Sequence, residues 1–353
     1  MNITLSKKSS GMALIVVMIA IAVFSALAAA LAFSMKVETK LARNAENEQQ
    51  MLWLGRSGVE YARWILSQHP PAEPYDSLNQ IWAGGPGGPS ETNGPLAGIS
   101  LDHFKVGDGT VSLKIVDLER FANVNTAPPA LLQQALTVMG VDANDISVIA
   151  DSIQDWRSPP AAPRVAGAES DYYQSLTPPY NAKNAPFDDI SELLFVKGVT
   201  PEIYWGSSLA DHPAAQKPKL GFAVAPGQTP DYPFGLRDVF TAVSSGKINV
   251  NTADVNVLQL IPGVDTNTAA AIIQQRAGPD GMDGTEDDTP FRNPADALKF
   301  AGPAAAQAAN LVTVGSSTWR VSVTAQIGDA RREFTAILYR GGPDIQVVGF
   351  YWK

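Results

Sequence analysis

The chain contains no cysteine among its 353 residues. It therefore has no disulfide framework, no thiolate nucleophile and no zinc–thiolate site. Histidine is scarce too: His69, His103 and His212 are far apart, and each lies near a proline, a turn or a strand edge, so we expect all three at the surface. No residue pattern of a catalytic centre stands out, and we expect that the protein is not an enzyme.

The chain has fewer basic than acidic residues, with 26 Lys and Arg against 35 Asp and Glu, so its net charge is −9. Nucleic-acid binding depends mainly on neutralising phosphates, so this composition predicts no nucleic acid partner. An acidic surface is better suited to calcium and to selective contacts with other proteins.

Residues 12–33 contain no charged residue, no proline and no glycine. As a helix this segment would be about 33 Å long, enough to cross a hydrocarbon core of about 30 Å. Lys7 and Lys8 precede it and favour a cytoplasmic N-terminus, which sends the rest of the chain across the membrane in a single pass. A secretory signal has a shorter apolar core with its cleavage site after that core. Here the apolar helix would stay with the mature protein.

The leader ends in Ser9-Ser10-Gly11 and resembles that of type IV pilins and pseudopilins. The resemblance implies that a prepilin peptidase cuts between Gly11 and Met12 and that Met12 is then methylated. Most members carry glutamate at mature position five, where this chain has Val16. A subunit without that glutamate suits a place with no neighbour above it. The alternative is an uncleaved signal anchor that holds an unrelated periplasmic domain.

No proline interrupts the chain before Pro70, so the helix should continue beyond the membrane. An apolar stripe returns along one face of its second half, at Leu54, Gly58 and Tyr61. Together with Val16, this face either contacts the helices of neighbouring subunits or, for its second half, packs under the protein's own sheet.

Strand patterns at both ends of the chain enclose a helical middle. We expect antiparallel strands at 99–106, 110–117, 319–327, 331–340 and 345–351, packed on the long helix as an α+β layer. The expected organisation is a leader at 1–11, a transmembrane and filament-core helix at 12–34, and its periplasmic continuation at 35–70. A pilin-like α+β domain follows, formed by 71–117 and 317–353, with a mostly α-helical domain inserted at 118–316.

The inserted region contains an internal repeat, because the pattern of residues 121–127 recurs at 247–253. Each copy precedes a pair of helical patterns that resembles a helix-hairpin-helix module. Thr126 and Thr252 are expected to cap the first helix of each pair. Asp142 and Asp265 stand where nucleic-acid-binding hairpins have glycine, and a carboxylate there would repel phosphate. The repeat therefore favours a structural or protein-binding module.

Several strings in the middle of the chain match one family, and they lie at 149–157, 167–169, 171–173, 185–193 and 196–199. They resemble the type II secretion minor pseudopilin K, also called general secretion pathway protein K or GspK. The resemblance implies a subunit of the cell inner membrane with its C-terminal domain in the periplasm. It also implies a place at the pseudopilus tip with the minor pseudopilins I and J, joined by H above the major pseudopilin G. The large size of the insertion is consistent with a place at the tip, because an insertion of this size would clash if it were repeated along a narrow filament.

Two other functions remain open at this point. One is a minor pilin of a type IV pilus or DNA-uptake machine, which would share the leader and use the hairpins to bind DNA. The other is a single-span periplasmic adaptor with no role in a filament.

Two acidic groups are candidate calcium sites, since calcium takes six to eight oxygen ligands. The resemblance adds that K-family members bind calcium in the helical domain. The alternative for both groups is a solvated acidic loop. The first group is Asp280, Asp283, Glu286, Asp287 and Asp288, and the weaker second group is Glu169, Asp171, Asp188 and Asp189.

Asp151 and Asp155 stand four residues apart on a predicted helix and have the spacing of a catalytic acid and base. The neighbouring Trp156 and Arg157 instead indicate a capped, salt-bridged helix end.

Overall fold

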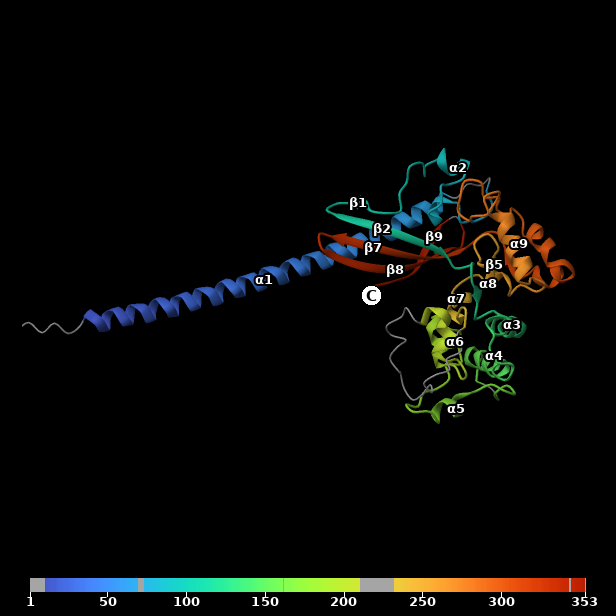
Figure 1. Ribbon diagram of the computed structural model, residues 1–353, viewed down its shortest axis with the longest axis horizontal. Helices are drawn as coiled ribbons and strands as arrows, with labels where there is room; N and C mark the ends of the chain where they lie inside the picture. The colour runs from blue at the N-terminus through green and yellow to red at the C-terminus, as the bar shows by residue number, and fades with distance from the viewer. Residues whose placement is uncertain (1–9, 69–72, 161, 210–231, 343, 353) are drawn as a thin grey trace, which may run out of the picture.

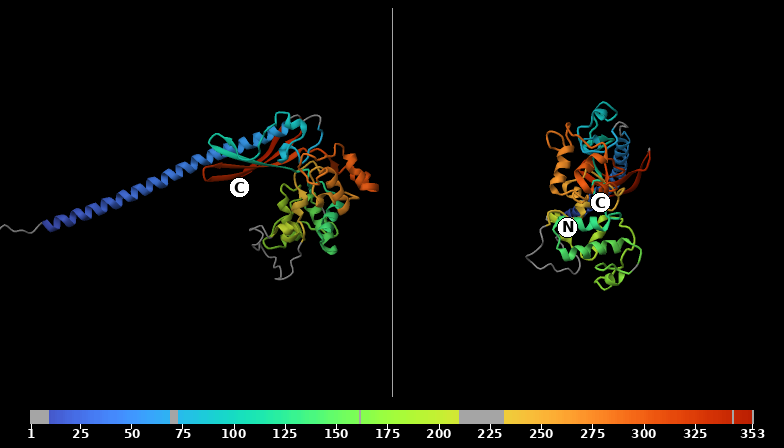
Figure 2. Two further views of the ribbon diagram at one scale, coloured as in Figure 1. Left: turned by 45° about the horizontal axis from the view of Figure 1, so that its top comes forward. Right: turned by 90° about the vertical axis from the view of Figure 1, so that its right-hand side faces the viewer.

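A computed structural model of the chain describes residues 10–68, 73–160, 162–209, 232–342 and 344–352. Its first element is a single helix, α1 (Ser10–Ser67), which has no proline to interrupt it. The N-terminal part of α1 projects away from the rest of the molecule, and its C-terminal part lies against a sheet (Figures 1 and 2). His69, Pro70 and His212 lie outside the described residues, as do Lys7 and Lys8 of the predicted leader.

The sheet has five antiparallel strands in the order β1-β2-β7-β8-β9. Strands from the two ends of the helical middle meet at its centre, where Asp117 of β2 lies opposite Trp319 of β7. The strands are β1 (Phe104–Val106), β2 (Gly109–Asp117), β7 (Thr318–Ile327), β8 (Ala330–Arg340) and β9 (Ile345–Trp352).

The predicted strand at 99–106 is too long, because β1 begins only at Phe104. The amide of Ile99 donates to the carbonyl of Leu96 in a turn, and the Ser100 hydroxyl bonds the carbonyl of Asp102. His103 then has a positive φ of 49°, which ends any extended run before it. These local hydrogen bonds compete with strand pairing over residues 99–103.

The C-terminal half of α1 packs against the buried face of the sheet through two glycines. A Cβ on Gly58 would lie 2.4 Å from Val323 Cγ1, and one on Gly55 would lie 2.6 Å from the Phe334 ring. Only glycine lets the helix backbone approach the strands so closely. The core between them is apolar, and Val111 of β2 is fully buried in it.

The remaining elements from β3 to β6 lie between β2 and β7 in the sequence and surround a second, separate core cluster. Two short parallel pairs organise it: β3 (Ala122–Asn123) with β4 (Phe240–Thr241), and β5 (Ile248–Asn249) with β6 (Val312–Thr313). The helices are α3 (Pro129–Met139), α4 (Ala143–Arg157), α5 (Ser170–Gln174), α6 (Pro201–Trp205), α7 (Leu236–Val239), α8 (Val255–Leu258), α9 (Thr266–Arg276), α10 (Pro294–Leu298) and α11 (Ala305–Ala308).

Short 3-10 turns complete the described chain. They are η1 (Ile81–Ala83), η2 (Ile190–Phe195), η3 (Gly206–Leu209) and η4 (Lys299–Ala304), and the one-turn helix α2 (Pro89–Thr92) follows η1. A long helix on an antiparallel sheet, with a helical region between two of the strands, confirms the expected α+β class.

Candidate functional site

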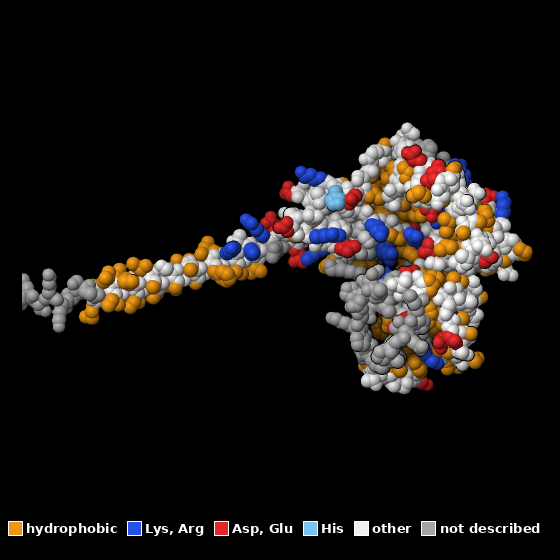
Figure 3. Space-filling model, in the orientation of Figure 1, with side chains coloured by type: hydrophobic (Ala, Val, Ile, Leu, Met, Phe, Trp, Pro, Cys, Tyr) orange, Lys and Arg blue, Asp and Glu red, His pale blue; other side chains and the backbone are white. Residues whose placement is uncertain are grey.

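The projecting half of α1 carries most of the exposed large hydrophobic side chains of the described chain. The helix is long and apolar enough to cross a membrane, with a mean hydropathy of 2.9 in its most apolar window and none of that window buried. Gly11 and Met12 lie in its first turn, and Val16 follows one turn later with 65% of its surface exposed. Apolar side chains cover this part of the helix, and charged ones gather where it reaches the sheet (Figure 3).

The second half of the predicted partner face is occupied by the protein's own sheet. Leu54 is 6% exposed, and Gly58 lies against Val323, as described above. The Tyr61 ring lies 4.6 Å from the Phe104 ring of β1, between centroids. The second half of this face therefore packs under the protein's own sheet and is not available to the helices of neighbouring subunits. Of the four predicted contact residues, only Val16 does not contact the sheet.

The internal repeat is a structural duplication built on asparagines. Asn123 Oδ1 accepts from the Asn125 amide at 2.8 Å, and in the second copy Asn249 Oδ1 accepts from the Asn251 amide at 3.0 Å. The next asparagine in each copy binds the backbone of a distant phenylalanine in both directions. Asn125 pairs with Phe187 at 2.7 and 2.9 Å, and Asn251 pairs with Phe291 at 2.9 Å twice.

An arginine at the end of the second helix closes each copy. Arg157, the last residue of α4, donates to the carbonyls of Val124 and Ala127. Arg276, the last residue of α9, donates to the corresponding carbonyls of Val250 and Ala253, at 2.6 and 2.7 Å. Sequence reasoning missed both the arginines and the phenylalanines. The available signal was the Pro-Phe dipeptide that follows each helix pair, at 186–187 and 290–291.

The prediction that Thr126 and Thr252 are helix N-caps is wrong. Helix α3 begins after Pro128, which has no capping side chain, and α8 is capped by Asp254, whose carboxylate accepts from two amides of the first turn. The Thr252 hydroxyl donates instead to Asp117 Oδ2 at 2.5 Å. In each copy the threonine is still part of the asparagine turn, because its backbone amide bonds within that turn. The helix begins only after the turn, at Pro129 in α3 and at Val255 in α8.

Asp142 and Asp265, in the hairpins, are the true N-caps of the second helices. Asp142 Oδ1 accepts from the Asn144 amide at 2.9 Å, and Asp265 Oδ1 accepts from the Thr268 amide at 2.8 Å. The hydrogen bond from Thr268 lowers the pKa of Asp265, so this carboxylate is charged at neutral pH. These two carboxylates therefore already accept hydrogen bonds from backbone amides that a bound phosphate would need at the hairpins.

Two buried carboxylates that sequence reasoning missed tie the insertion to the sheet. Asp117, the last residue of β2, accepts from Thr252, from Asn249 Nδ2 at 3.2 Å and from the Glu119 amide at 2.8 Å. Burial, followed by the nearby charge of Glu119, raises the pKa of Asp117 to about 8. Glu119 in turn accepts from the Ser317 hydroxyl at 2.8 Å.

Glu119 links the segment before the second repeat copy to the sheet, since its carboxylate also accepts from the amides of Ser245 and of Thr318, the first residue of β7, each at 3.0 Å. Asp76, in the loop after α1, accepts from the Ser316 amide at 2.7 Å. These bonds join the loop after α1, the sheet and the segments before the two repeat copies at one buried junction, which ties the insertion to the strands that carry it.

In the predicted acidic loop 280–288, the four aspartates already have partners within the chain. Asp283 forms a paired ion contact with Arg276 at 2.7 and 2.8 Å. Asp287 accepts from the Asp280 amide, and Asp288 accepts from the Gly284 amide, each at 2.9 Å. Over the described ranges, no three acidic or histidine side chains converge as a metal site would require. Calcium binding, including at Glu286, stays a prediction.

The weaker acidic group is spread over two short elements. Asp188 pairs with Lys183 at 2.7 Å, and the Asp189 side chain accepts from the Ser191 amide at the start of η2. Glu169 and Asp171 lie at the first turn of α5.

Asp151 and Asp155 do not face one another as an acid and a base. Asp155 has 1% of its side chain exposed and binds Arg164 Nη1 at 2.5 Å, whereas Asp151 accepts from the Ala166 amide at 3.2 Å. The helix end is salt-bridged through Asp155 and Arg164, whereas Arg157 binds backbone carbonyls instead.

Comparison with known proteins agrees with these features. The family model of the type II secretion system protein K matches residues 113–206, which run from β2 through the first repeat copy. Protein K of Pseudomonas aeruginosa is 23% identical over 345 residues, covering 94% of this chain and 89% of that protein. These matches show that the chain is similar to the type II secretion protein K family.

Another K-family protein, that of Aeromonas hydrophila, is 28% identical over 207 residues, an alignment that covers 56% of this chain and 61% of that relative. Among solved structures, the complex of GspK, GspI and GspJ from enterotoxigenic Escherichia coli contains a chain with a TM-score of 0.63 and 18% identity. The match covers 88% of this chain and 99% of that one, and it shows that the two share a fold.

Proposed function

We propose that this chain is a minor pseudopilin at the tip of the type II secretion pseudopilus. There it assembles with the minor pseudopilins I and J, and with H, above a filament of the major pseudopilin G. The filament drives export of proteins across the outer membrane. The observation that carries the proposal is α1, a continuous helix whose first half is exposed and apolar and whose second half is fixed to the sheet.

An exposed apolar rod has two stable environments, the hydrocarbon core of a membrane and a bundle of similar helices. A pseudopilin needs both, since its subunits leave the inner membrane to join the filament. In this proposal prepilin peptidase cuts before Met12, the new N-terminus is methylated and the folded domain lies in the periplasm. Val16, in place of glutamate, leaves no carboxylate to neutralise the N-terminus of a subunit above.

The helical insertion supports a terminal position. It lies at the end of the sheet remote from the projecting part of α1, and the junction of Asp117, Glu119 and Asp76 fixes it there (Figure 1). A subunit whose folded region is much wider than its helix packs poorly against copies of itself along a filament. The hairpin N-caps Asp142 and Asp265 speak against a DNA-uptake role.

The proposal is tested by export in cells that lack the gene. We expect that the full chain restores release of exoproteins, that Gly11→Leu does not because the peptidase no longer processes it, and that Ser10→Ala does. Full export with an unprocessed Gly11→Leu protein would contradict the proposal and favour a fixed periplasmic adaptor.

A further inference from the structure

Among the residues that the structure describes, no strand pairs with the second half of β2 on its β1 side. Strand β1 pairs only with residues 109–111, and beyond it a single loop bond runs from the Leu113 amide to the Leu101 carbonyl at 2.7 Å. On the opposite side the strand continues its pairing with β7, and the next bond in that series runs from Leu118 to Thr318.

In an antiparallel strand, alternate residues direct their amide and carbonyl groups to opposite sides. Since Leu113 bonds on the β1 side and Leu118 on the β7 side, Ile115 and Asp117 direct their backbone amides toward the open edge. Within the described part of the chain these amides have no backbone partner. Such an edge is a template for another strand.

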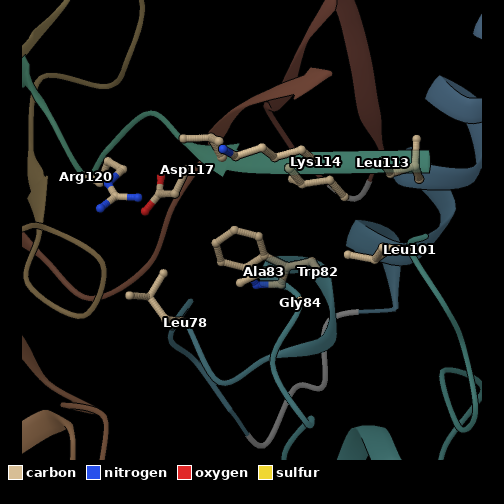
Figure 4. A pocket seen from close by; sticks show the side chains of 11 residues that line it. Leu78, Trp82, Ala83, Gly84, Leu101, Leu113, Lys114, Asp117 and Arg120 are labelled. Atoms are coloured by element: carbon tan, nitrogen blue, oxygen red, sulfur yellow. The ribbon is translucent and has the colours of Figure 1, made fainter. Parts of the chain in front are cut away.

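A cavity of about 240 Å³ lies directly in front of this edge. All residues of 113–117 line it, as expected when a strand faces a cavity with its edge and not with one of its faces. The opposite wall is η1 with the residues around it, and Figure 4 shows Trp82, Ala83 and Gly84 facing β2 across the space. The Trp82 indole N–H is already bonded to Gln80 Oε1 at 2.8 Å, so the ring contributes apolar surface.

Two cations stand at the same cavity on a chain whose net charge is −9. Lys114 is exposed and Arg120 is half-buried, with its guanidinium 5.6 Å from the Phe121 ring. Neither forms an ion pair with any residue that the structure describes. The buried side chain of Asp117 forms no ion pair with either cation in the described structure; it accepts from Asn249, Thr252 and the Glu119 amide instead.

We propose that this groove receives an extended segment of a partner protein, which adds a strand to the open edge of β2. The backbone of the segment bonds Ile115 and Asp117, an apolar side chain of the segment packs against Trp82 and Leu101, and a carboxylate of the segment lies at Lys114 and Arg120. Strand addition suits these three features together, since main-chain bonds give affinity and the pockets for alternate side chains give specificity. The inference does not depend on the proposed place in the pseudopilus.

The test places a photoreactive benzoylphenylalanine at Lys114 of the full chain in cells that are secreting. The matched control carries it at Lys105, an exposed lysine of β1 away from the groove. We expect an adduct to one polypeptide from position 114 and not from position 105, and we expect Ala83→Trp, which fills the groove, to reduce it at least tenfold. No adduct at 114, or an adduct that Ala83→Trp leaves unchanged, would overturn the proposal.

Hydrogen exchange of the same preparations tests the strand itself and does not depend on any variant folding. The amides of Ile115 and Asp117 should exchange at least tenfold more slowly in the partner-bound chain than in the free chain, because new backbone bonds protect them. Unchanged exchange would rule out strand addition. An adduct to a protein outside the secretion system would support the groove and count against the tip assignment, so the two inferences fail separately.

Discussion

Replacing Asp117 by asparagine should change how the stability of the protein depends on pH. The folded chain holds this buried carboxyl with a pKa of about 8, whereas in the unfolded chain the group has an ordinary pKa near 4. Between these values the folded state binds a proton that the unfolded state has released. Stability is therefore greatest below about pH 4 for this group and is lost as the pH rises through 8, with a limiting slope on the order of 1 kcal/mol per pH unit.

Asp117→Asn removes that titration and keeps the shape of the neutral acid. Its oxygen can still accept from the Glu119 amide, and the Thr252 hydroxyl can rotate to accept from the new amide. The amide does face Asn249 Nδ2, which loses one acceptor but keeps the Asp76 carbonyl and the Ser316 hydroxyl. We expect a loss of about 1 kcal/mol at pH 5, which vanishes or reverses at pH 8.

The assay is urea unfolding of the full chain in detergent between pH 5 and pH 8, followed by tryptophan fluorescence. Asp108→Asn is the control, because Asp108 is an exposed residue of the β1–β2 turn. The wild type and this control should lose stability with rising pH more steeply than Asp117→Asn does. Parallel pH profiles for Asp117→Asn and the wild type would refute the assignment of the slope to this carboxyl.

Other parts of the molecule give sharp expectations as well. Gly58→Val should destabilise the chain by about 1–3 kcal/mol in the same unfolding assay, because a Cβ there meets Val323, and Gly342→Ala, where a Cβ meets nothing, should have little effect. Asn125→Ala and Asn251→Ala should each cost about 2–4 kcal/mol, since each removes paired bonds to a buried backbone; an effect in one copy alone would contradict the duplication. If loop 280–288 binds calcium, calcium should raise the melting temperature over that in chelator, and an unchanged melting temperature would remove the site.

The sequence was sufficient for the features that follow from periodicity. An uninterrupted apolar segment predicts α1, and alternation in β2 predicts which of its side chains, Val111 among them, face the helix. The repeat was visible because the asparagine turn needs the same residue types in both copies. These signals are local, and local pattern determines where helices and strands form.

The features that were missed depend on contacts between residues far apart in the chain. Nothing near Asp117 or Glu119 indicates that they are buried, since the side chains that bind them lie more than a hundred residues away. Arg157 had a nearer explanation as a salt-bridged helix end, yet its guanidinium binds backbone carbonyls of the repeat. The prediction of a strand over residues 99–103 was wrong, because hydrogen bonds of the Ser100 and Ser112 side chains hold a loop where the hydropathy pattern predicts an extended strand.

The most direct test of the proposed function is native mass spectrometry of the full chain extracted gently from secreting cells with its cognate minor pseudopilins. We expect a complex that contains I and J, in which this chain begins at a methylated Met12. A chain that still begins at Met1 and is found without either partner would contradict the proposed function.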